Sequence, residues 1–523
     1  MPVGFKELEA RHAIRLAQPL RVESAIGPTR TSVESPDRVQ NQYTPGYRPE
    51  DTFAGHFEFG LKYEDVHLEF FARLFAVLGP APIEAWCRHE PFGQYARRAG
   101  FLYEWLTGQR LDLPDLTNGA YIDALASDAY LTRTQPLRDR RWRVNNNLPG
   151  TRGFCPIVRR TAALQEGMQF DPGAALAALD REFGEDMLMR AAAWLTFKES
   201  RASFLIENEA DQGDRIKRFA HVIGEQCGKI DEPLSNASLQ ALQSGILGDA
   251  ALRLGLRLSP VFVGQATLTE DIVHFIGPHF HDVEGMLDGL KEFERATRGR
   301  EALARAAAIA FGFVYVHPMS DGNGRIHRFL INDTLRRDGA VPDGVILPVS
   351  ASITNTREFG HGYDRTLEVF SRPFMRRYAT SYRFGEFVTY DDGVRSNLVF
   401  DEYQDANHAW RYPDLTEHVI YTAKLVAHTI HTEMAEEARV LLKFQRAQQR
   451  IKDMMEMPDL DSARIIRSIK ESGWTISGKL AKEYPALGDK ALALRLVEAV
   501  QSAFEDREPV PIVVGSVKTS GTS

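Results

Sequence analysis

A twelve-residue segment at 317–328 combines residue types that together can act on phosphate groups. It reads His-Pro-Met-Ser-Asp-Gly-Asn-Gly-Arg-Ile-His-Arg. The Gly-Asn-Gly turn at 322–324 lies where a new helix is expected to begin, and the free backbone N–H groups at a helix start bind anions. Arg325 and Arg328 are three residues apart and share one helical face, where guanidinium groups can grip further phosphates. The segment therefore predicts a phosphate-binding site.

Two further side chains of this segment extend the prediction from binding to catalysis. Asp321 supplies hard oxygen ligands that suit Mg²⁺ bridging two phosphates. His317 lies where Pro318 ends the preceding helix, and an imidazole can accept or give a proton near neutral pH. A short Asp-Gly-Asn-Gly turn is common by itself, so the prediction depends on the whole segment. Together these groups indicate phosphoryl or nucleotidyl transfer.

The segment resembles the signature of the Fic (Fido) family, which reads His-Pro-Phe-x-Asp/Glu-Gly-Asn-Gly-Arg-x-x-Arg. Met319 stands where the signature has Phe, and a flexible apolar side chain can fill the same space. The resemblance extends from near Ser203 to about Arg377. It implies a mainly α fold, with an all-helical Fic core that carries a β-hairpin flap.

The resemblance implies that the chain transfers AMP from ATP to a Ser, Thr or Tyr hydroxyl of a protein target, as a nucleotidyltransferase. His317 would deprotonate that hydroxyl, and Asp321 would hold Mg²⁺ on the α- and β-phosphates. The nucleotide would be held by Gly322, Asn323 and Gly324 as the anion hole, Arg325 on the β-phosphate, Arg328 on the γ-phosphate and Tyr363 near the adenine. Asp364 departs from the paired tyrosines that the family often has there. A phosphorylating relative carries Ala-Asn-Lys-Arg instead of Gly-Asn-Gly-Arg, so the loop favours AMP transfer.

The segment 260–280 alternates apolar and polar residues and is long enough for a β-hairpin. It matches the family's target-docking flap at Val273, His274, Phe275 and Ile276. An exposed strand edge of this kind recruits an extended segment of a partner by β-augmentation. Three histidines at 274, 279 and 281 also suggest zinc, but their irregular spacing and the absence of a nearby cysteine favour polar contacts of the flap.

The segment 203–208, Ser-Phe-Leu-Ile-Glu-Asn, resembles the family's inhibitory motif Ser/Thr-x-x-x-Glu-Gly/Asn, with Ser203, Glu207 and Asn208 at its defining positions. Ser203 and Glu207 are four residues apart and share a helical face. The Glu207 carboxylate could pair with Arg328 and block a productive ATP pose. Two alternatives stay open: an ordinary helix with a surface glutamate, and a glutamate that positions water so that the same site removes AMP from a modified protein.

The elements that must position these residues are predicted to be mainly helical. Buried apolar residues and helix formers predict that the loop is held between helices at 300–315 and 325–337. Asp392-Gly393 predicts a strand–turn–strand over 386–400. Further helices are expected at 63–78, 94–106, 185–210, 238–247, 283–297 and 415–455, with short helices at 460–505.

Composition breaks divide the chain into seven predicted segments. They are an extended N-terminal arm (1–55), an α-rich N-terminal domain (56–184), the inhibitory helix and linker (185–230), the Fic core (231–385), a strand pair and long helix (386–458), a small helical or winged-helix module (459–508) and a tail (509–523).

Composition limits the cellular compartment and the partners that we expect for this protein. The 523 residues carry 63 Lys+Arg against 71 Asp+Glu, a net charge of −8, and only three cysteines. The few, widely spaced cysteines favour a reducing compartment. Because no segment resembles a secretion signal or a membrane span, we expect a cytoplasmic protein with no membrane partner. Helical faces outside the core could support a homo-oligomer.

An Arg-rich stretch raises a further function class. The arginines at 138, 140, 141 and 143 surround Trp142, and arginine beside an aromatic ring can grip phosphate and stack a base. The alternative is a solvated loop whose arginines pair with acids, which the acidic balance of the chain favours. A Fic-core regulator or toxin with nucleic-acid binding in the flanking regions stays open on this stretch and on a helix-turn-helix reading of 460–505.

Overall fold

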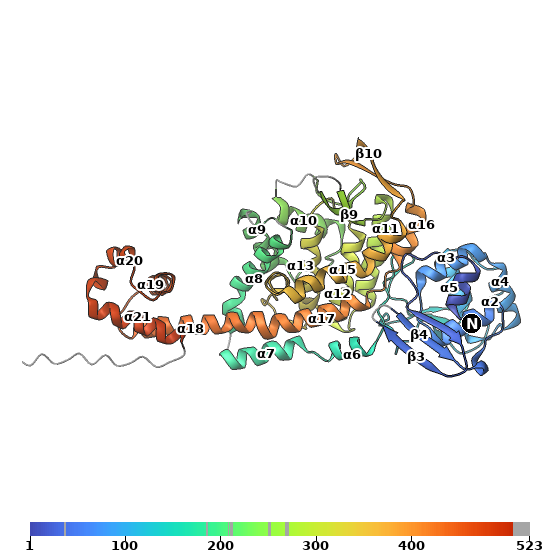
Figure 1. The fold of residues 1–523 in the computed structure, drawn as a ribbon, viewed down its shortest axis with the longest axis horizontal. Coiled ribbons are helices and arrows are strands. Elements are labelled where there is room, and N and C mark those ends of the chain that lie inside the picture. Colours follow the sequence, from blue (N-terminus) through green and yellow to red (C-terminus); the bar gives the residue numbers. More distant parts are fainter. Residues whose placement is uncertain are drawn as a thin grey trace, which may run out of the picture. The chain divides into compact units, whose positions relative to one another are not determined.

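The computed structural model describes residues 1–35, 38–184, 187–207, 209, 213–248, 253–266 and 271–505 of the chain, which is mainly helical (Figure 1). Contacts group it into two units. The first joins Met1–Gly173 to Trp194–Thr429, and the second joins Ala174–Ala193 to Ile430–Ser523. This division differs from the seven predicted segments, because contacts between distant parts of the chain define the units and composition does not reveal them.

The first 55 residues form a sheet and a helix, which corrects the prediction of an extended arm. The strands β1 (Pro2–Val3), β2 (Val22–Ile26), β3 (Thr31–Ser35) and β4 (Arg38–Tyr43) are ordered β1-β2-β4-β3, with β2 and β4 parallel. Helix α1 (Phe5–Arg11) buries Phe5 and Leu8, and a 3-10 turn, η1 (Pro45–Tyr47), follows the sheet. The short strands of this segment show little periodicity, which is why the sequence suggested no regular structure.

Four helices continue the N-terminal part of the first unit: α2 (Phe53–Tyr63), α3 (Leu68–Leu78), α4 (Ala81–His89) and α5 (Gln94–Thr107). The helix predicted over 63–78 is wrong at its start, because α2 ends at Tyr63 and α3 begins at Leu68. The end of α5 is confirmed, since Gly108 adopts a left-handed φ of 72°. Their core is rich in phenylalanine: Phe57, Phe70, Phe71 and Phe75 are buried together.

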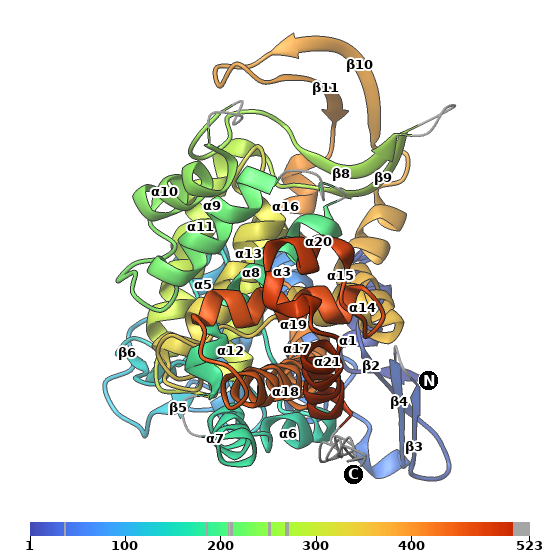
Figure 2. The same ribbon diagram turned by 90° about the vertical axis from the view of Figure 1, so that its left-hand side faces the viewer.

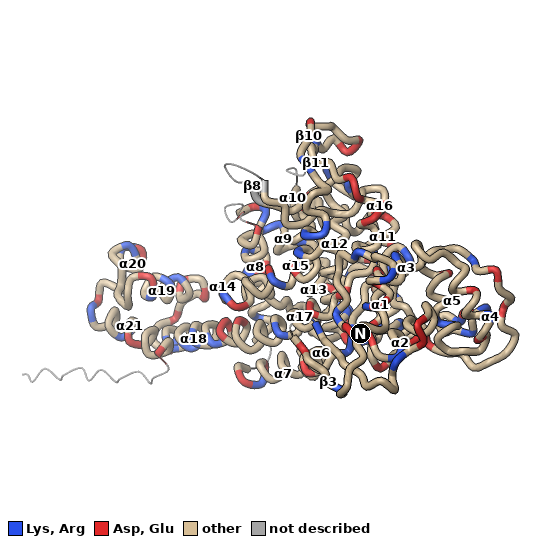
Figure 3. The backbone as a smooth tube through the Cα atoms, turned by 45° about the vertical axis from the view of Figure 1, so that its right-hand side comes forward, with Lys and Arg blue, Asp and Glu red and all other residues tan. Residues whose placement is uncertain are grey.

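The Arg-rich stretch lies among three short strands, β5 (Ile122–Asp123), β6 (Leu137–Asp139) and β7 (Val144–Asn146). Arg141 forms an ion pair with Glu104 at 2.9 Å, and Trp142 is 5% exposed with its indole N–H donating to the same carboxylate. Figure 3 shows Lys and Arg interspersed with Asp and Glu over the backbone. Arg141 is thus paired with acids, as the alternative interpretation expects, whereas Arg143 donates to the carbonyls of Leu116 and Thr117.

The helical part of the first unit surrounds α12 (Ala302–Val316), which is buried along nearly its whole length. Four small alanines of α12 are 0% exposed and let the neighbouring helices approach closely. Besides α12, this part contains the portion of α8 (Met187–Ile206) that begins at Trp194. Its other helices are α6 (Ala162–Met168), α9 (Gly213–Gln226), α10 (Asn236–Leu247), α11 (Phe280–Ala296), α13 (Asn323–Arg337), α14 (Val349–Asn355), α15 (Arg357–Arg377), α16 (Tyr403–Arg411) and α17 (Thr416–His428).

Two hairpins lie side by side at one end of this unit (Figure 2). The predicted flap is confirmed as a hairpin of β8 (Phe262–Ala266) and β9 (Asp271–Ile276), and the predicted second strand pair is β10 (Tyr382–Thr389) and β11 (Arg395–Phe400). The rings of Phe262 and Phe384 meet edge to face at 5.3 Å. Asp392, in the turn of the second hairpin, accepts a 2.7 Å hydrogen bond from the backbone N–H of Leu258.

The second unit is helical throughout its described part. It contains most of α7 (Pro172–Phe183), a π-helical turn η3 (Thr429–Met434) shared with the first unit, α18 (Ala435–Lys452), α19 (Asp459–Glu471), α20 (Gly478–Glu483), the 3-10 turn η4 (Pro485–Gly488) and α21 (Lys490–Phe504). Its buried core includes four isoleucines, at 451, 465, 466 and 469. Residues 430–505 contain no strand, so they lack the β-hairpin of a winged helix. Of the two predicted alternatives, the structure agrees with the small helical module. The predicted tail, 509–523, lies outside the described residues.

Within the described residues, no single helix is long and apolar enough to cross a bilayer, although α3 and α4, which meet at 99°, reach that length and composition together.

Candidate functional site

The loop between α12 and α13 is shaped by two left-handed residues. His317 ends α12 at φ 47° and Gly322 precedes α13 at φ 88°. The Asn323 side chain braces the turn, accepting from the Met319 N–H at 3.0 Å and donating to the Met319 carbonyl at 2.7 Å. Met319 is 0% exposed, which confirms its expected packing role. The loop is thereby fixed before any ligand binds.

His317 is placed as a base. Its Nδ1 lies 3.1 Å from the Val314 carbonyl, which can only accept, so Nδ1 carries the proton and Nε2 keeps a free lone pair. Burial and the nearby Arg257 lower the pKa of His317 to about 4. The imidazole is therefore neutral and able to accept a proton across the physiological pH range.

The two arginines of the motif are each 1% exposed on α13, and both contact α8 or the residues just after it. Arg328 donates to the Ser203 hydroxyl at 2.8 Å and to the Glu207 carboxylate at 2.8 Å. The predicted pairing of Glu207 with Arg328 is thus present in the structure. Asn208, the last residue of the predicted motif, lies outside the described residues.

The Glu207 carboxylate also occupies the anion cradle. A Cβ at Gly324 would collide with it, so the glycine leaves the space that this carboxylate fills. Burial raises the pKa of Glu207, but the charges of Arg328 and Arg325 outweigh burial and hold the pKa below its ordinary value. The side chain is therefore ionised at neutral pH, at the place where a phosphate is expected.

A second acid that the sequence did not reveal binds the other arginine. Glu209 forms a 2.7 Å ion pair with Arg325, whose guanidinium also lies 4.6 Å over the Phe204 ring. In a continuing helix, residues 207 and 209 would face different sides. Because α8 ends at Ile206, both carboxylates turn toward α13. Two nitrogens of Arg325, Nε and Nη1, have no partner among the described residues.

Asp321 lies exposed at the mouth of the loop. One carboxylate oxygen accepts from the Gly322 N–H at 2.6 Å, which leaves the other oxygen for a cation. No group of three metal-binding side chains occurs among the described residues, so a cation here would need ligands from elsewhere, as Mg²⁺ does when it takes them from phosphates and water. This donor set fits the predicted Mg²⁺ on a nucleotide.

The flap lies beside the base. Val273, Phe275 and Ile276 are buried to 8% exposure or less, whereas His274 is exposed. The ring centroid of Phe275 is 6.4 Å from that of His317. An extended segment paired with β9 would therefore run close to the imidazole.

Tyr363 lies on α15 and is 7% exposed, packed near the rings of Phe311, His327 and Tyr421. Burial raises its pKa, and the positive charge of Arg328 opposes that rise. The predicted adenine contact is not tested by this placement.

Glu199 is a further buried acid on the helix of the predicted brake. Its carboxylate accepts from the Ser350 N–H at 2.7 Å and the Ser350 hydroxyl at 2.6 Å, and so fixes α8 to the start of α14. Residues 199, 203 and 207 are spaced four apart, a spacing that places side chains on one face of a helix. This spacing can be read from the sequence alone. Burial raises the pKa of Glu199 to about 7.

Replacing Glu199 by glutamine should change the pH dependence of stability. The unfolded chain ionises Glu199 near its ordinary pKa of 4.5, whereas the folded protein keeps the proton up to about 7. Between these values the folded state binds more protons, so wild-type stability falls as pH rises. The free energy of unfolding of Glu199→Gln, relative to wild type, should therefore increase by about 1 kcal/mol per pH unit across this window. Urea unfolding at several pH values measures it, and a constant difference would contradict it.

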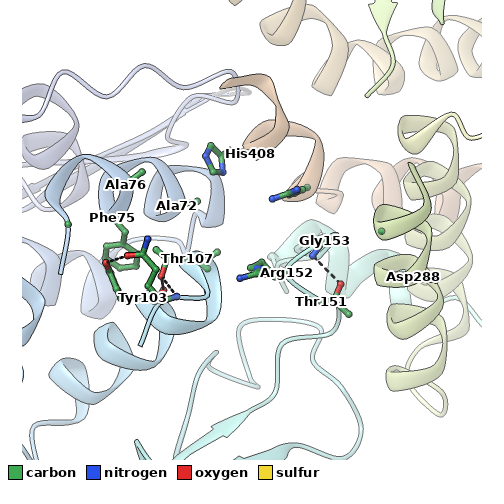
Figure 4. Close-up of a pocket in the computed structure, with 15 residues that line it drawn as sticks. Ala72, Phe75, Ala76, Tyr103, Thr107, Thr151, Arg152, Gly153, Asp288 and His408 are labelled. Atoms are coloured by element: carbon green, nitrogen blue, oxygen red, sulfur yellow. Dashed lines mark hydrogen bonds between the residues drawn. The ribbon is translucent and has the colours of Figure 1, made fainter. Parts of the chain in front are cut away.

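A cavity of about 700 Å³ lies away from this loop, between α3, α5, the 151–153 turn, α11 and α16 (Figure 4). Arg152 and His408 line it, as Figure 4 shows, but none of the candidate site residues does. The arrangement of the loop, and not the cavity, defines the candidate site.

Parts of the chain are similar to known proteins. Residues 234–335 match the Fic/DOC family. The protein adenylyltransferase fic-1 of Caenorhabditis briggsae is 34% identical over 96 residues, covering 18% of this chain and 17% of that protein. Its namesake in Caenorhabditis elegans is 29% identical over 144 residues, covering 27% and 26%. The match thus spans about a quarter or less of the relatives' length. A Fic family protein from Desulfovibrio desulfuricans G20 aligns over 62% of this chain and 94% of its own, with 16% identity and a TM-score of 0.38.

Proposed function

We propose, on the premise that this chain is a Fic family protein with its Fic domain at 234–335, that it transfers AMP from ATP to a hydroxyl of a protein target and that Glu207 inhibits the transfer. One observation carries the proposal: an acidic side chain of the same chain fills the cradle of Gly324 and Arg328, where a nucleotide phosphate would bind. The printed names of the two Caenorhabditis relatives support the choice of AMP transfer.

The reaction follows from the placement of the side chains. A target segment paired with β9 presents its Ser, Thr or Tyr hydroxyl to Nε2 of His317, which accepts the proton. The hydroxyl oxygen attacks the α-phosphorus, a P–O bond to AMP forms, and pyrophosphate leaves. Backbone N–H groups at the start of α13 stabilise the charge on the α-phosphate. Arg325 and Arg328 bind the leaving phosphates as charge-assisted donors.

Magnesium fits this proposal through Asp321, whose free carboxylate oxygen would hold the ion next to the loop. When bound, Mg²⁺ neutralises charge on the phosphates. The two unpartnered nitrogens of Arg325 then have acceptors in the β-phosphate oxygens, which explains why a buried guanidinium is left incompletely bonded among the described residues.

The inhibited state follows from competition for Arg328. A γ-phosphate and the Glu207 carboxylate need the same guanidinium donors, and both are anions. ATP must therefore displace Glu207 or bind in an unproductive pose. Mass spectrometry of the protein and of candidate targets after incubation with ATP and Mg²⁺ tests the proposal, with an added AMP mass as the expected product.

Removing the charge of Glu209 should release the brake weakly. This ion pair with Arg325 involves a carboxylate that is 32% exposed, and such pairs contribute up to about 1 kcal/mol. The variant Glu209→Gln is therefore expected to raise AMP incorporation by up to about fivefold. Rates of incorporation from labelled ATP measure the effect. A rise as large as that of a Glu207 variant, or a decrease, would contradict this minor role.

A further inference from the structure

We infer that Arg257 is a positioning residue, which holds the base His317 and the target-docking flap at one fixed spacing. Its side chain is 1% exposed. The inference rests on the proposed AMP transfer for its functional meaning, but the contacts that carry it are independent of that proposal.

The guanidinium of Arg257 joins three separate segments. Nε donates to the His317 carbonyl at 2.7 Å, Nη1 to the Ser259 carbonyl at 3.0 Å, and Nη2 to the Pro278 carbonyl at 2.6 Å. The backbone N–H of the same residue donates to the Pro318 carbonyl at 2.9 Å. One side chain thus bonds the end of α12 to the chain that leaves β9.

This arginine has carbonyl acceptors in place of a carboxylate partner. Among the described residues, no carboxylate is hydrogen-bonded to this guanidinium. Burial lowers the pKa of Arg257 to about 10, and the charges of Tyr403 and Asp392 oppose that fall. Arg305, which is also fully buried, pairs with Glu294 and Asp338. A buried guanidinium without a directly bonded carboxylate depends on its neutral hydrogen-bond acceptors, so the contacts of Arg257 fix the positions of three carbonyls.

The bonded carbonyl of His317 belongs to a strained residue. Its φ of 47° is uncommon for a side chain other than glycine, and surrounding contacts must hold it there. The direction of the imidazole depends on this backbone, because Nδ1 is fixed within the preceding turn by the Val314 carbonyl. Arg257 is therefore one of the groups that aim Nε2.

The bonded carbonyl of Pro278 belongs to the end of the flap. Between Pro278 and β9 lies Gly277, where a Cβ would approach the Arg257 guanidinium to 3.2 Å, so the side chain lies tightly against the chain at this point. A target hydroxyl carried on β9 is thus placed relative to Nε2 through one guanidinium. Misplacement of reacting groups by about 1 Å can cost about 10²-fold in rate.

The test compares Arg257→Met and Arg257→Lys in protein that also carries Glu207→Gly, so that transfer is measurable. Arg257→Met should lower the AMP transfer rate at saturating ATP by about 10²-fold. The Kd for ATP should change by less than about twofold, because Arg325 and Arg328 do not contact Arg257. Arg257→Lys keeps the charge but cannot reach three carbonyls at once, so it should lose about tenfold in rate.

A second readout does not depend on activity. Burial lowers the pKa of His317 most, the charge of Arg257 lowers it further, and the Val314 carbonyl and the charge of Glu207 raise it. In the common Glu207→Gly background, NMR titration should show a higher His317 pKa in Arg257→Met than in the parent, still below its ordinary value because burial remains, and no rise in Arg257→Lys. The matched control is Arg305→Met, which removes another buried arginine and should lower stability without moving the His317 pKa.

Several outcomes overturn the inference. These are an unchanged transfer rate in folded Arg257→Met, a loss of ATP affinity equal to the loss of rate, and an equal shift of the His317 pKa in Arg305→Met. If Arg257→Met does not fold, an unchanged rate in Arg257→Lys overturns it and a tenfold loss supports it. If the parent Glu207→Gly transfers no AMP, the proposed function fails, whereas the His317 titration still decides whether the Arg257 guanidinium acts on the imidazole.

Discussion

Replacing His317 by alanine should reduce AMP transfer by about 10²–10⁴-fold, the range that a general base contributes. The reason is that Nε2 carries the free lone pair of the neutral His317 imidazole, and this ring lies beside the flap. The measurement is the rate of AMP incorporation from labelled ATP, in protein that also carries Glu207→Gly. Because the pKa of His317 is about 4, that parent protein should keep its rate as the pH falls from 8 to about 5.

A matched variant separates the effect of removing the imidazole from the effect of changing the loop backbone. Asparagine tolerates left-handed φ values, so His317→Asn keeps the loop conformation while removing the imidazole. It should lose transfer as alanine does and retain ATP binding. A variant without an imidazole that transfers AMP at the parent rate would remove His317 from the mechanism.

Replacing Glu207 by glycine should raise AMP incorporation by about 10- to 100-fold. A charged hydrogen bond contributes about 1.5–3 kcal/mol, and about 1.4 kcal/mol corresponds to a factor of ten. The variant frees Arg328 and empties the space over Gly324, so that a γ-phosphate can bind in both places. Mass spectrometry after incubation with ATP and Mg²⁺ should show the added AMP mass in this variant above wild type.

Two controls sharpen the Glu207 result. Glu207→Gln keeps the shape of the side chain without its charge and should release the brake in part. Glu225, an exposed acid on α9, provides a Glu225→Ala control that should leave incorporation unchanged. No rise in Glu207→Gly would remove the brake, and Glu207-dependent loss of AMP from a pre-modified target would assign this side chain to AMP removal instead.

Much of the site was predictable because its parts are close in sequence. Residues 317–328 fix a helix end, a turn with a left-handed glycine, a helix start and two arginines one turn apart, all through local chemistry. Ser203 and Glu207 share a face for the same reason. The two hairpins were also predictable, since alternation and Asp392-Gly393 are local signals.

The parts that sequence reasoning missed depend on contacts between distant segments. The N-terminal sheet joins β2 to β4 in parallel, which local periodicity does not show. For the Arg-rich stretch, the sequence favoured pairing with acids without naming the partner, and the fold supplies it: Glu104 binds both Arg141 and Trp142. Glu209 was missed because the end of α8, and not the spacing of residues, turns its carboxylate toward Arg325.

The sequence by itself determined the residue types of the loop: a histidine, an aspartate, a Gly-Asn-Gly turn and two arginines within twelve residues. Only the tertiary structure decided which groups meet that loop. It placed Glu207 and Glu209 on the two arginines, Glu199 under α14, and Arg257 between His317 and Pro278. The physical reason is that helix and turn geometry act over a few residues, whereas burial selects partners across the whole chain.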